Sequence, residues 1–289
     1  MTISQTIEIP APSAPRPVRV EAAGLTDVGR VRPRNEDAYL IATLQRSMTV
    51  HDANPPAAQS WVPGEPEGLL LVVADGMGGH AAGEVASQEA IDTVHGMVKR
   101  GKTSLKLEGP LTDERSRAAA RLLEGAVQAA TYIVYAMAEI DRGKAGMGTT
   151  ITAMMRFGTA LVTAQVGDSR IYRVRGDEAV QLTEDHTLIN WQLKQGIITP
   201  EEARVSKQRN VITRAVGSRD YVQVDTTVSE PELGDAFLIC SDGLHGYLRT
   251  EEIPAILAEG GHFSVKKLID IANGRGGKDN ITAIVVEVS

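Results

Sequence analysis

The residues best suited to chemistry in this sequence are acidic side chains at the edges of short apolar runs. For example, Asp75 follows the run Leu69–Val73, and Asp279 directly precedes a run that begins at Ile281. Apolar runs of this length are typical of buried strands, and strand ends from opposite directions meet at one edge of an antiparallel sheet. Four aspartates share this placement: Asp75, Asp168, Asp242 and Asp279. We therefore expect side chains that are far apart in the chain to converge.

A convergence of carboxylates requires cations to balance the buried charge. Glu36 and Asp37, beside another apolar run, add two more acids. Oxygen ligands suit magnesium or manganese rather than zinc, and the sequence has no Cys/His spacing that would supply softer ligands. Two such ions about 3.5 to 4 Å apart can acidify a bridging water, which is a general way to hydrolyse a phosphate ester.

Each of these aspartates also has a simpler explanation. The Asp-Gly pairs at 75–76 and 242–243 are typical of tight turns, Gly-Asp-Ser at 167–169 is typical of a hairpin, and Asp279-Asn280 can form an Asx turn. Four such coincidences, each at the edge of an apolar run, favour one shared site over four separate turns.

The elements that must position these acids are strands and helices. Val18–Leu25 and Ala38–Leu44 are predicted as two strands that pair antiparallel, and Leu69–Val73 as a buried strand. This third strand delivers Asp75 into a glycine-rich turn, where the backbone can take positive φ angles and lie close to an ion or a phosphate. The glycines of that turn are Gly76, Gly78 and Gly79.

Two helices follow from 3.6-residue periodicity. The first begins near Gly83 and presents a face of small and apolar residues to the sheet: Ala86, Ala90, Val94 and Met97. The second is long, Asp113–Ile140, and its spacing predicts a core face. That predicted face consists of Leu122, Ala126, Ala129, Ile133, Met137 and Ile140.

The second half of the chain is rich in short strands. A meander of antiparallel strands is predicted at Thr149–Met155, Thr159–Val166, Ile171–Val174 and Ala179–Leu182. Further strands are predicted at Val222–Val228, Ala236–Cys240 and Ile281–Val288, with short helices capped by Thr250 and Ser264 between the last two. Two segments interrupt the pattern. Gln45–Gly68 is predicted to be an irregular excursion, and Asp185–Asp220, with a helical piece at Leu188–Lys194, is a candidate lid beside the site.

These elements predict an α+β fold, an α-β-β-α sandwich of two antiparallel sheets packed face to face with helices outside. Residues 18–289 are expected to form one domain, with the candidate lid at 185–220, and residues 1–17 a flexible proline-rich tail.

The composition of the chain excludes several classes of binding partner and of protein. The net charge of −7 and the lack of a Lys/Arg cluster argue against a nucleic-acid binder, and no apolar run is long enough to span a membrane. The single cysteine, Cys240, lies inside an apolar run, so no disulfide is possible and a buried hydrophobic role is expected. A cytoplasmic protein is the default expectation.

Taken together, the motifs resemble those of one family, the metal-dependent protein serine/threonine phosphatases of type 2C in their bacterial form. The resembling stretches occur in the family's order and span about 26–286: VRPRNEDAY, VVADGMGGHAAGEVAS, MGTTITA, VGDSRIY, ICSDGLHGYL and GGKDNITAIVV. Cys240 lacks the phosphate loop that a cysteine-based phosphatase needs.

The resemblance implies a role for each matching residue. Arg32 is similar to the arginine that clamps the substrate phosphate, with Arg34 as the alternative, and Glu36 resembles the acid that orients metal-bound water. Asp168 resembles part of a third, weaker ion site shared with Asp242. The ligands of the two catalytic ions would be Asp37, Asp75, the Gly76 carbonyl, Asp242 and Asp279.

Two positions depart from the family pattern. Gly246 stands where many relatives have an acidic residue that can serve the third ion. Met77 stands where animal and plant members have a histidine, so no general acid is assigned there. His80 and His245 lie nearby in the sequence, and each is interpreted as a local hydrogen-bonding residue rather than a proton donor.

The predicted function is therefore hydrolysis of phosphoserine and phosphothreonine in proteins by a water activated between two Mn²⁺ or Mg²⁺ ions, without a phosphoenzyme. Two alternatives remain at this point: an inactive phosphatase-like binding module, and a small-molecule phosphohydrolase on the same fold. The resemblance also implies a cognate serine/threonine kinase as a partner, and we expect a monomer.

Overall fold

The structure is a computed structural model of the 289-residue chain. It describes residues 20–44, 48–54, 68–78, 82–102, 113–157, 160–208 and 210–288. The predicted tail at 1–17 lies outside the described residues.

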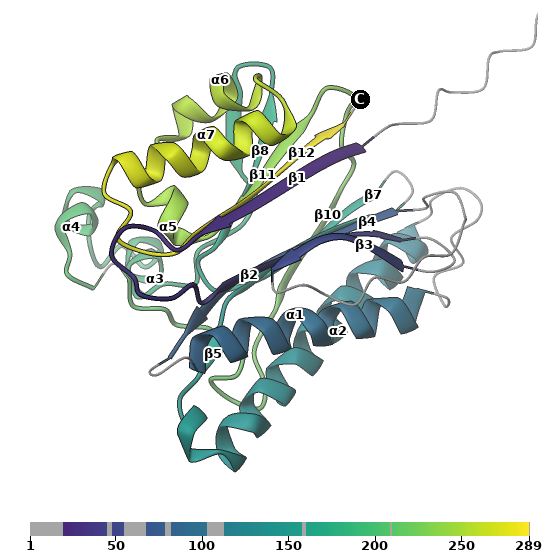
Figure 1. The fold of residues 1–289 in the computed structure, drawn as a ribbon, viewed down its shortest axis with the longest axis vertical. Coiled ribbons are helices and arrows are strands. Elements are labelled where there is room, and N and C mark those ends of the chain that lie inside the picture. The colour runs from purple at the N-terminus through teal and green to yellow at the C-terminus, as the bar shows by residue number, and fades with distance from the viewer. Residues whose placement is uncertain are drawn as a thin grey trace, which may run out of the picture.

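Two antiparallel sheets stack face to face between helices (Figure 1). The five-stranded sheet has the order β1-β12-β11-β8-β9, formed by Val20–Asp27, Ile281–Val288, Ala236–Cys240, Arg170–Arg175 and Glu178–Gln181. The seven-stranded sheet has the order β10-β7-β6-β4-β2-β3, formed by Asp225–Ser229, Ala160–Val166, Ile151–Phe157, Gly68–Met77, Asp37–Leu44 and Met48–Asn54. The short strand β5, Gly148–Thr149, also pairs with β4. The predicted α-β-β-α sandwich is confirmed.

Helices cover the outer face of each sheet. Against the seven-stranded sheet lie α1 (Ala82–Gly101) and α2 (Asp113–Ile140), followed by the 3-10 turn η2 (Arg142–Lys144). Over the five-stranded sheet lie α5 (Asp242–His245), η3 (Thr250–Glu252), α6 (Ile253–Leu257) and α7 (Gly261–Gly274). Apolar side chains fill all three interfaces: helix against sheet on each side, and sheet against sheet in the middle.

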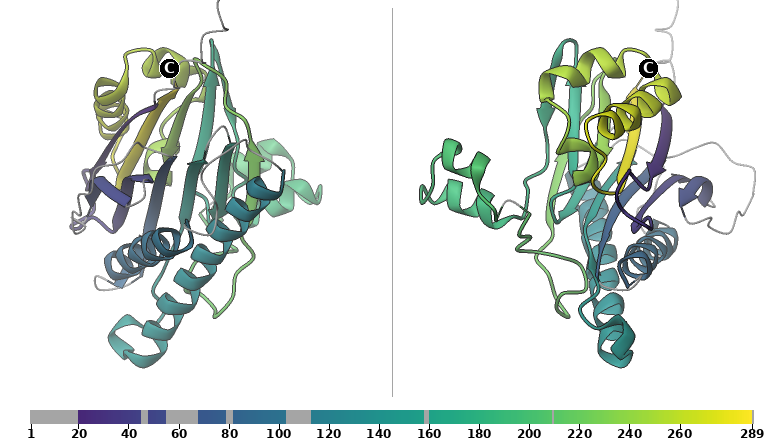
Figure 2. Two further views of the ribbon diagram at one scale, coloured as in Figure 1. Left: turned by 90° about the vertical axis from the view of Figure 1, so that its right-hand side faces the viewer. Right: turned by 60° about the vertical axis from the view of Figure 1, so that its left-hand side comes forward.

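Between β9 and β10 the chain leaves the sandwich and forms α3 (Leu188–Lys194) and α4 (Pro200–Val205). These helices stand away from the side of the sandwich (Figure 2, right). The helix predicted at Leu188–Lys194 is present with those bounds, capped by the Thr187 hydroxyl, which accepts a hydrogen bond from Asn190 N.

Several predicted connections are wrong. β1 does not pair with β2, because β1 pairs with β12 in one sheet while β2 pairs with β3 and β4 in the other. The predicted meander is also broken, since β7 and β8 belong to opposite sheets and the chain crosses between them at 167–169. Part of the expected excursion at 45–68 is the strand β3. Local patterns predict a strand, but its partner is chosen by the closure of the whole sandwich.

The long helix α2 has the predicted bounds, but its buried face is displaced from the predicted one. Leu123, Val127 and Val134 are fully buried, whereas Ile133 is at the surface and Ile140 is 85% exposed. Alanines are so frequent in this helix that adjacent stripes are almost equally apolar, so the sequence does not single out the stripe that faces the sheet. On the α1 face, the prediction is correct for Ala86, Ala90 and Val94, which are fully buried.

The caps of the last helices also differ from prediction. Arg249, not Thr250, is the N-cap of η3, and Ser264 lies inside α7, where its buried hydroxyl donates to the Ile256 carbonyl.

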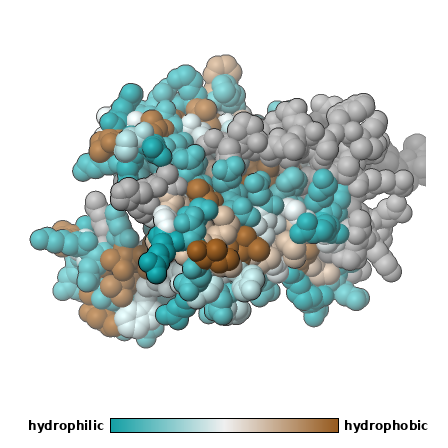
Figure 3. Space-filling view, turned by 60° about the horizontal axis from the view of Figure 1, so that its bottom comes forward, coloured by the Kyte–Doolittle hydropathy of each residue, from teal (hydrophilic) through white to brown (hydrophobic). Residues whose placement is uncertain are grey.

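On the face that comes forward in Figure 3, apolar side chains form small groups among hydrophilic ones. No helix within the described ranges is both long enough and apolar enough to span a bilayer.

Candidate active site

The first two predicted ligands are direct neighbours across the seven-stranded sheet. Asp37 begins β2, Asp75 lies near the end of β4, and the antiparallel register pairs these two residues. Two carboxylates brought together in this way repel each other unless protons or cations balance them. The sequence had placed Asp75 in a turn, but β4 continues through it to Met77, so the strand itself holds this carboxylate.

Asp37 is held from the other sheet. Its Oδ2 accepts hydrogen bonds from the Ser241 hydroxyl at 2.8 Å and from the Thr282 hydroxyl at 2.7 Å. Ser241 follows β11 and Thr282 lies in β12, and both are fully buried. Burial raises the pKa of Asp37 to about 7, although the bonds from Thr282 and Ser241 lower it. The two hydroxyls therefore fix this carboxylate at the interface between the sheets.

Asp75 is held through its backbone. Its N–H donates to the Thr150 hydroxyl at 2.9 Å, and its carbonyl accepts from Thr150 N at 2.9 Å and from the Thr149 hydroxyl at 2.9 Å. Burial raises the pKa of Asp75 well above its ordinary value, and the charges of Asp37 and Asp242 raise it further.

The adjacent Gly76 is also part of the strand. A Cβ atom at this position would lie 2.3 Å from the Gly83 carbonyl and 2.5 Å from the Glu36 carbonyl, so only glycine allows these backbones to meet. Of the predicted glycine turn, Gly78 has the positive φ that was expected, at 154°, and Gly79 lies outside the described residues.

Asp242 and Asp168 approach from the five-stranded sheet. Asp242 begins α5, one residue beyond the N-cap Ser241 that follows β11. Burial raises the pKa of Asp242, and the charge of Asp279 raises it further. Asp168 lies in the crossing between β7 and β8 and is 6% exposed. Burial and the charge of Asp242 raise the pKa of Asp168 to about 7. Its Oδ1 is buried without a hydrogen-bond partner among the described residues.

Arg32 and Asp279 form an ion pair at the mouth of the site, with 2.7 Å between Nη2 and Oδ2. The hydrogen bond to Asp279 raises the pKa of the Arg32 guanidinium, so this group carries its positive charge throughout the working pH range. About half of the Arg32 side chain is exposed, which leaves it accessible to an incoming anion. Among the described residues, the side chain of Arg34 forms no hydrogen bond or ion pair with these acids, so Arg32 is the better placed of the two candidates.

Glu36 lies at the end of the same loop, and burial raises the pKa of its carboxyl. Its backbone is fixed on both sides. Its N–H donates to the Asn280 side-chain oxygen at 2.8 Å, and its carbonyl accepts from the Ser87 hydroxyl at 2.6 Å and from Gly76 N at 3.2 Å. This loop therefore lies against both β4 and the start of β12.

The histidines near the motifs are not assigned as acids. His245 Nε2 lies 3.0 Å from the Asp168 carbonyl, and burial lowers the pKa of this imidazole to about 3. A ring that is neutral at physiological pH and shares its hydrogen with a carbonyl is a structural donor. His80 lies outside the described residues. Cys240 is fully buried, and burial raises the pKa of its thiol to about 12, so it is not a nucleophile.

A pocket of about 830 Å³ adjoins these acids. One wall includes Asp168, Asp242 and Asp279, and the opposite wall comes from the predicted lid, with Ile189, Asn190 and Leu193 of α3.

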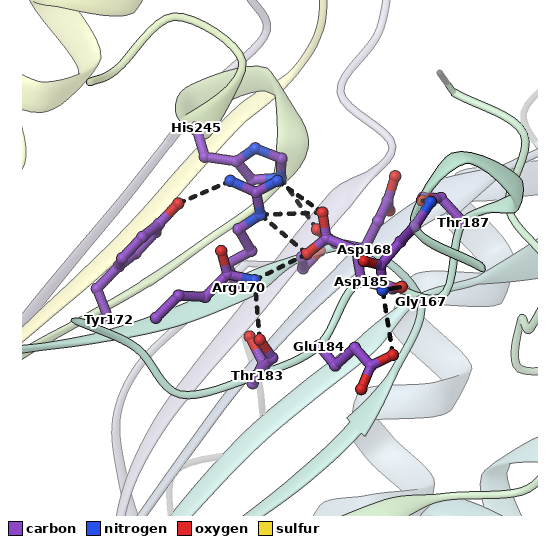
Figure 4. Close-up of polar contacts among 12 residues, drawn as sticks. Gly167, Asp168, Arg170, Tyr172, Thr183, Glu184, Asp185, Thr187 and His245 are labelled. Carbon is purple, nitrogen blue, oxygen red and sulfur yellow. Dashed lines mark hydrogen bonds and ion pairs between the residues drawn. The ribbon is translucent and has the colours of Figure 1, made fainter. Parts of the chain in front are cut away.

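The base of that opposite wall is held by a bidentate ion pair (Figure 4). Arg170 Nε and Nη2 donate to the Asp185 carboxylate at 2.9 and 2.6 Å, and Arg170 Nη1 donates to the Tyr172 hydroxyl at 2.8 Å. His245 lies beside this pair in Figure 4 and reaches the crossing that carries Asp168. The candidate lid is thus tied to the five-stranded sheet next to the acids.

Sequence reasoning missed the residues that hold the acids in place: Thr150, Ser241, Asn280 and Thr282. All four are neutral and small, and each lies within two residues of a predicted strand end. Adjacency to an acid in the chain was the one available signal, as in Ser241-Asp242 and Asp279-Asn280. It does not reveal that Ser241 and Thr282 bond to Asp37, more than 200 residues earlier in the chain.

The donor set fits divalent cations. It includes four carboxylates whose pKa values are raised by burial and by neighbouring charges: Asp37, Asp75, Asp168 and Asp242. The buried Asp168 Oδ1 also has no hydrogen-bond partner in the described part of the chain. Hard oxygen ligands of this kind suit Mg²⁺ or Mn²⁺. Within the described ranges no three His, Cys, Asp or Glu side chains already stand together as a ligand group, and Asp279 is bonded to Arg32.

A profile of the family Protein phosphatase 2C matches residues 57–268. The chain belongs to the protein phosphatase 2C family. The prediction from the motifs is therefore confirmed at the level of the family.

Named relatives support the same family assignment. The chain is 35% identical over 266 residues to the serine/threonine phosphatase Stp of Listeria innocua, covering 91% of this chain and 93% of that protein. It is 38% identical over 225 residues to the serine/threonine protein phosphatase PstP of Mycobacterium tuberculosis, covering 76% of this chain but only 40% of PstP. The match thus spans less than half the length of that relative.

Solved structures with a similar fold support the same assignment. The structure resembles the catalytic domain of PstP solved in complex with two manganese ions, with a TM-score of 0.72 and 33% identity, covering 94% of this chain and 99% of that one. The comparisons support the main prediction, a serine/threonine protein phosphatase, rather than the binding module or the small-molecule phosphohydrolase.

Proposed function

We propose that this protein hydrolyses phosphoserine and phosphothreonine in other proteins at the acidic end of the sandwich. The observation that carries the proposal is the meeting of acids from both sheets. Asp37 and Asp75 are paired in one sheet, and Asp242, from the other sheet, lies close enough for its charge to raise the pKa of Asp75. These carboxylates repel one another when ionised, and bound divalent cations would stabilise their ionised forms.

Asp37, Asp75, the Gly76 carbonyl, Asp242 and Asp279 would hold two divalent ions. Such ions, when bound, lower the pKa of water and offset charge on a phosphoryl group. Manganese is the ion in the related PstP structure, and magnesium suits the same oxygen donors. Asp168 and Asp242 would contribute to a weaker third site, for which Gly246 offers no side-chain ligand.

The chain's own groups orient the substrate. Arg32 would exchange its bond with Asp279 for the phosphate of the substrate, because a guanidinium can bind two phosphate oxygens at once. Glu36, fixed by its backbone bonds to Asn280 and Ser87, would orient the attacking water by accepting a hydrogen bond. The water attacks phosphorus directly, and the serine or threonine oxygen leaves, so no phosphoenzyme forms.

The proposal extends to the setting of the reaction. Residues 18–289 would act as one phosphatase domain, with 185–220 as the lid that contacts the substrate. The protein would work as a cytoplasmic monomer in signal transduction, reversing the action of a cognate serine/threonine kinase.

The test is phosphate release from a phosphothreonine peptide and from p-nitrophenyl phosphate. We expect both reactions with Mn²⁺, neither after chelation, and recovery on adding Mn²⁺ back. Activity on p-nitrophenyl phosphate with none on any phosphopeptide would favour a small-molecule phosphohydrolase. Full activity after exhaustive metal removal, or wild-type turnover in D75A, would refute the mechanism.

A further inference from the structure

Asn280 uses its whole side-chain amide in hydrogen bonds to one loop. Its Oδ1 accepts from Glu36 N at 2.8 Å, and its Nδ2 donates to the Val28 carbonyl at 3.0 Å and to the Arg34 carbonyl at 2.8 Å. The residue is 4% exposed. An amide is the side chain that supplies two donors and an acceptor in this compact form.

The loop that Asn280 holds is 28–36, which crosses from β1 in one sheet to β2 in the other. It carries Arg32 and Glu36, and the bonds of Asn280 reach it near both ends. Its other anchors lie toward its two ends: Asn35 Nδ2 donates to the Thr26 hydroxyl at 2.8 Å, and the Glu36 carbonyl accepts from Ser87 and Gly76 as described above. Nearer its middle, Arg30 N donates to the Gly277 carbonyl at 2.6 Å, and within the described residues Arg32 is bonded through the tip of its side chain to Asp279 alone.

The backbone of Asn280 is itself fixed in the site. Its N–H donates to Asp279 Oδ1 at 2.9 Å, and a Cβ at Gly243 would lie only 1.8 Å from its carbonyl oxygen. Asn280 therefore stands where three segments meet: the loop, the start of α5 and the start of β12. Loss of its side-chain bonds would loosen the part of the loop between Arg30 and Glu36 without breaking either strand.

We propose that Asn280 is a positioning residue that sets the place of Arg32 over the acids, and hence the affinity of the site for the phosphate group. The inference rests on the proposed function in one respect, the contact of Arg32 with phosphate. It adds a neutral residue that never touches the substrate. Two carbonyls of the loop, at Val28 and Arg34, would lose their donor when the amide is removed.

The chemistry of the amide predicts how substitutions rank. N280D keeps the volume and the acceptor for Glu36 N, but a carboxylate cannot donate to the two carbonyls. N280A removes all three bonds. Buried groups left unsatisfied are costly, so we expect the loop to open in both variants. The inhibition constant for inorganic phosphate, measured with the Mn²⁺-loaded enzyme, should rise about tenfold in N280A.

Hydrogen exchange provides a readout that does not depend on activity. In N280A and N280D the amides of 28–36 should exchange faster, while those of β12 and β11 remain protected. I284V is the matched control, since Ile284 is a fully buried β12 residue in the core between the sheets. It should lower the melting temperature without altering loop exchange or phosphate inhibition. Unchanged loop exchange in the Asn280 variants would overturn the inference.

A double-mutant cycle with Arg32 separates the two proposals. R32A alone should weaken inhibition by phosphate, and adding N280A to R32A should weaken it by less than about a further twofold, because the positioned group is already gone. Additive effects would overturn the inference while leaving the role of Arg32 intact. Unaltered phosphate inhibition in R32A would overturn the role proposed for Arg32, and the inference with it.

Discussion

The two walls of the pocket are built in different ways. The acidic wall, with Asp168, Asp242 and Asp279, is backed by buried strand ends. Behind it Asp37, Ser241 and Thr282 are at most 3% exposed and bond to one another across the two sheets. The opposite wall is α3, and neither α3 nor α4 has a single buried residue. It depends on polar contacts at its base, chiefly the pair of Arg170 and Asp185.

From this difference we infer that the acidic wall carries out the reaction and that the α3 wall recognises the substrate. The acids must keep their places to within a fraction of an ångström, and a packed core provides that rigidity. Residues in a wall without core contacts can be substituted at little cost in folding stability, because exposed side chains contribute little to the free energy of unfolding. We therefore expect substitutions on the acidic wall to abolish turnover, and substitutions on α3 and α4 to alter substrate preference.

The largest effect is expected for D75N, which changes one of the buried acids behind the acidic wall. Removing one charge from the paired Asp37 and Asp75 should weaken metal binding and lower kcat/KM by about three orders of magnitude or more, because a metal ion supplies several kcal/mol of transition-state stabilisation. Steady-state kinetics with Mn²⁺ measure this loss. D177N, the same change in the exposed turn between β8 and β9, is the control and should leave kcat/KM unaltered.

The second prediction concerns stability of the metal-free protein against pH. The pKa values of Asp37 and Asp168 are raised to about 7, and that of Asp75 well above its ordinary value. Groups whose pKa is raised by folding stabilise the folded state at low pH, and that stability is lost as the pH rises through the folded value. His245 acts in the opposite direction, but only below its unfolded pKa of about 6.5.

The melting temperature in chelator should therefore fall between about pH 6.5 and pH 8. Mn²⁺ at a hundred times its dissociation constant should restore about 2.7 kcal/mol at pH 8. The fall should be smaller in D75N, which removes one of the raised carboxyls. A metal-free stability that stays constant or rises over this interval would contradict the raised pKa values.

The third prediction tests the base of the α3 wall. R170K keeps the charge but loses the two-pronged bond to Asp185, and we expect about 1–3 kcal/mol less stability because the pair is largely buried. The KM for a phosphopeptide should rise several-fold, with little change for p-nitrophenyl phosphate. R175K is the control, since Arg175 makes a similar bond to Asp235 elsewhere on β8. Equal effects of both variants on the two substrates would argue against a recognition role for the wall.

The smallest effect is expected at the tip of the segment. Val205, the last residue of α4, is 82% exposed, and V205S should change the free energy of unfolding by no more than about 0.5 kcal/mol. L70A, at a fully buried position of β4, should cost about 2–5 kcal/mol in the same urea titration. Similar losses in the two variants would mean that the segment belongs to the folding core.

Most elements could be predicted from the sequence because each has a strong local pattern. The strands Ala236–Cys240 and Ile281–Val288 and the helix Leu188–Lys194 have the predicted bounds. The four-residue helix α5 was not predicted, because Asp242–His245 is too short to show periodicity. The buried face of α2 was predicted only in part, because alanine-rich stripes differ little in polarity: Ala126 is fully buried, but Ile133 and Ile140 are exposed.

The sequence by itself determined the chemistry that is available: carboxylates at strand ends, an arginine close by, and motifs specific enough to indicate the family. These follow from residue type and local pattern, which need no knowledge of the partner. Only the tertiary structure decided that β1 and β2 lie in opposite sheets, that Thr282 bonds to Asp37, and that Asn280 holds the loop of Arg32. Such pairings join segments hundreds of residues apart, and they are selected by the packing of the whole sandwich, for which no short stretch of sequence carries a signal.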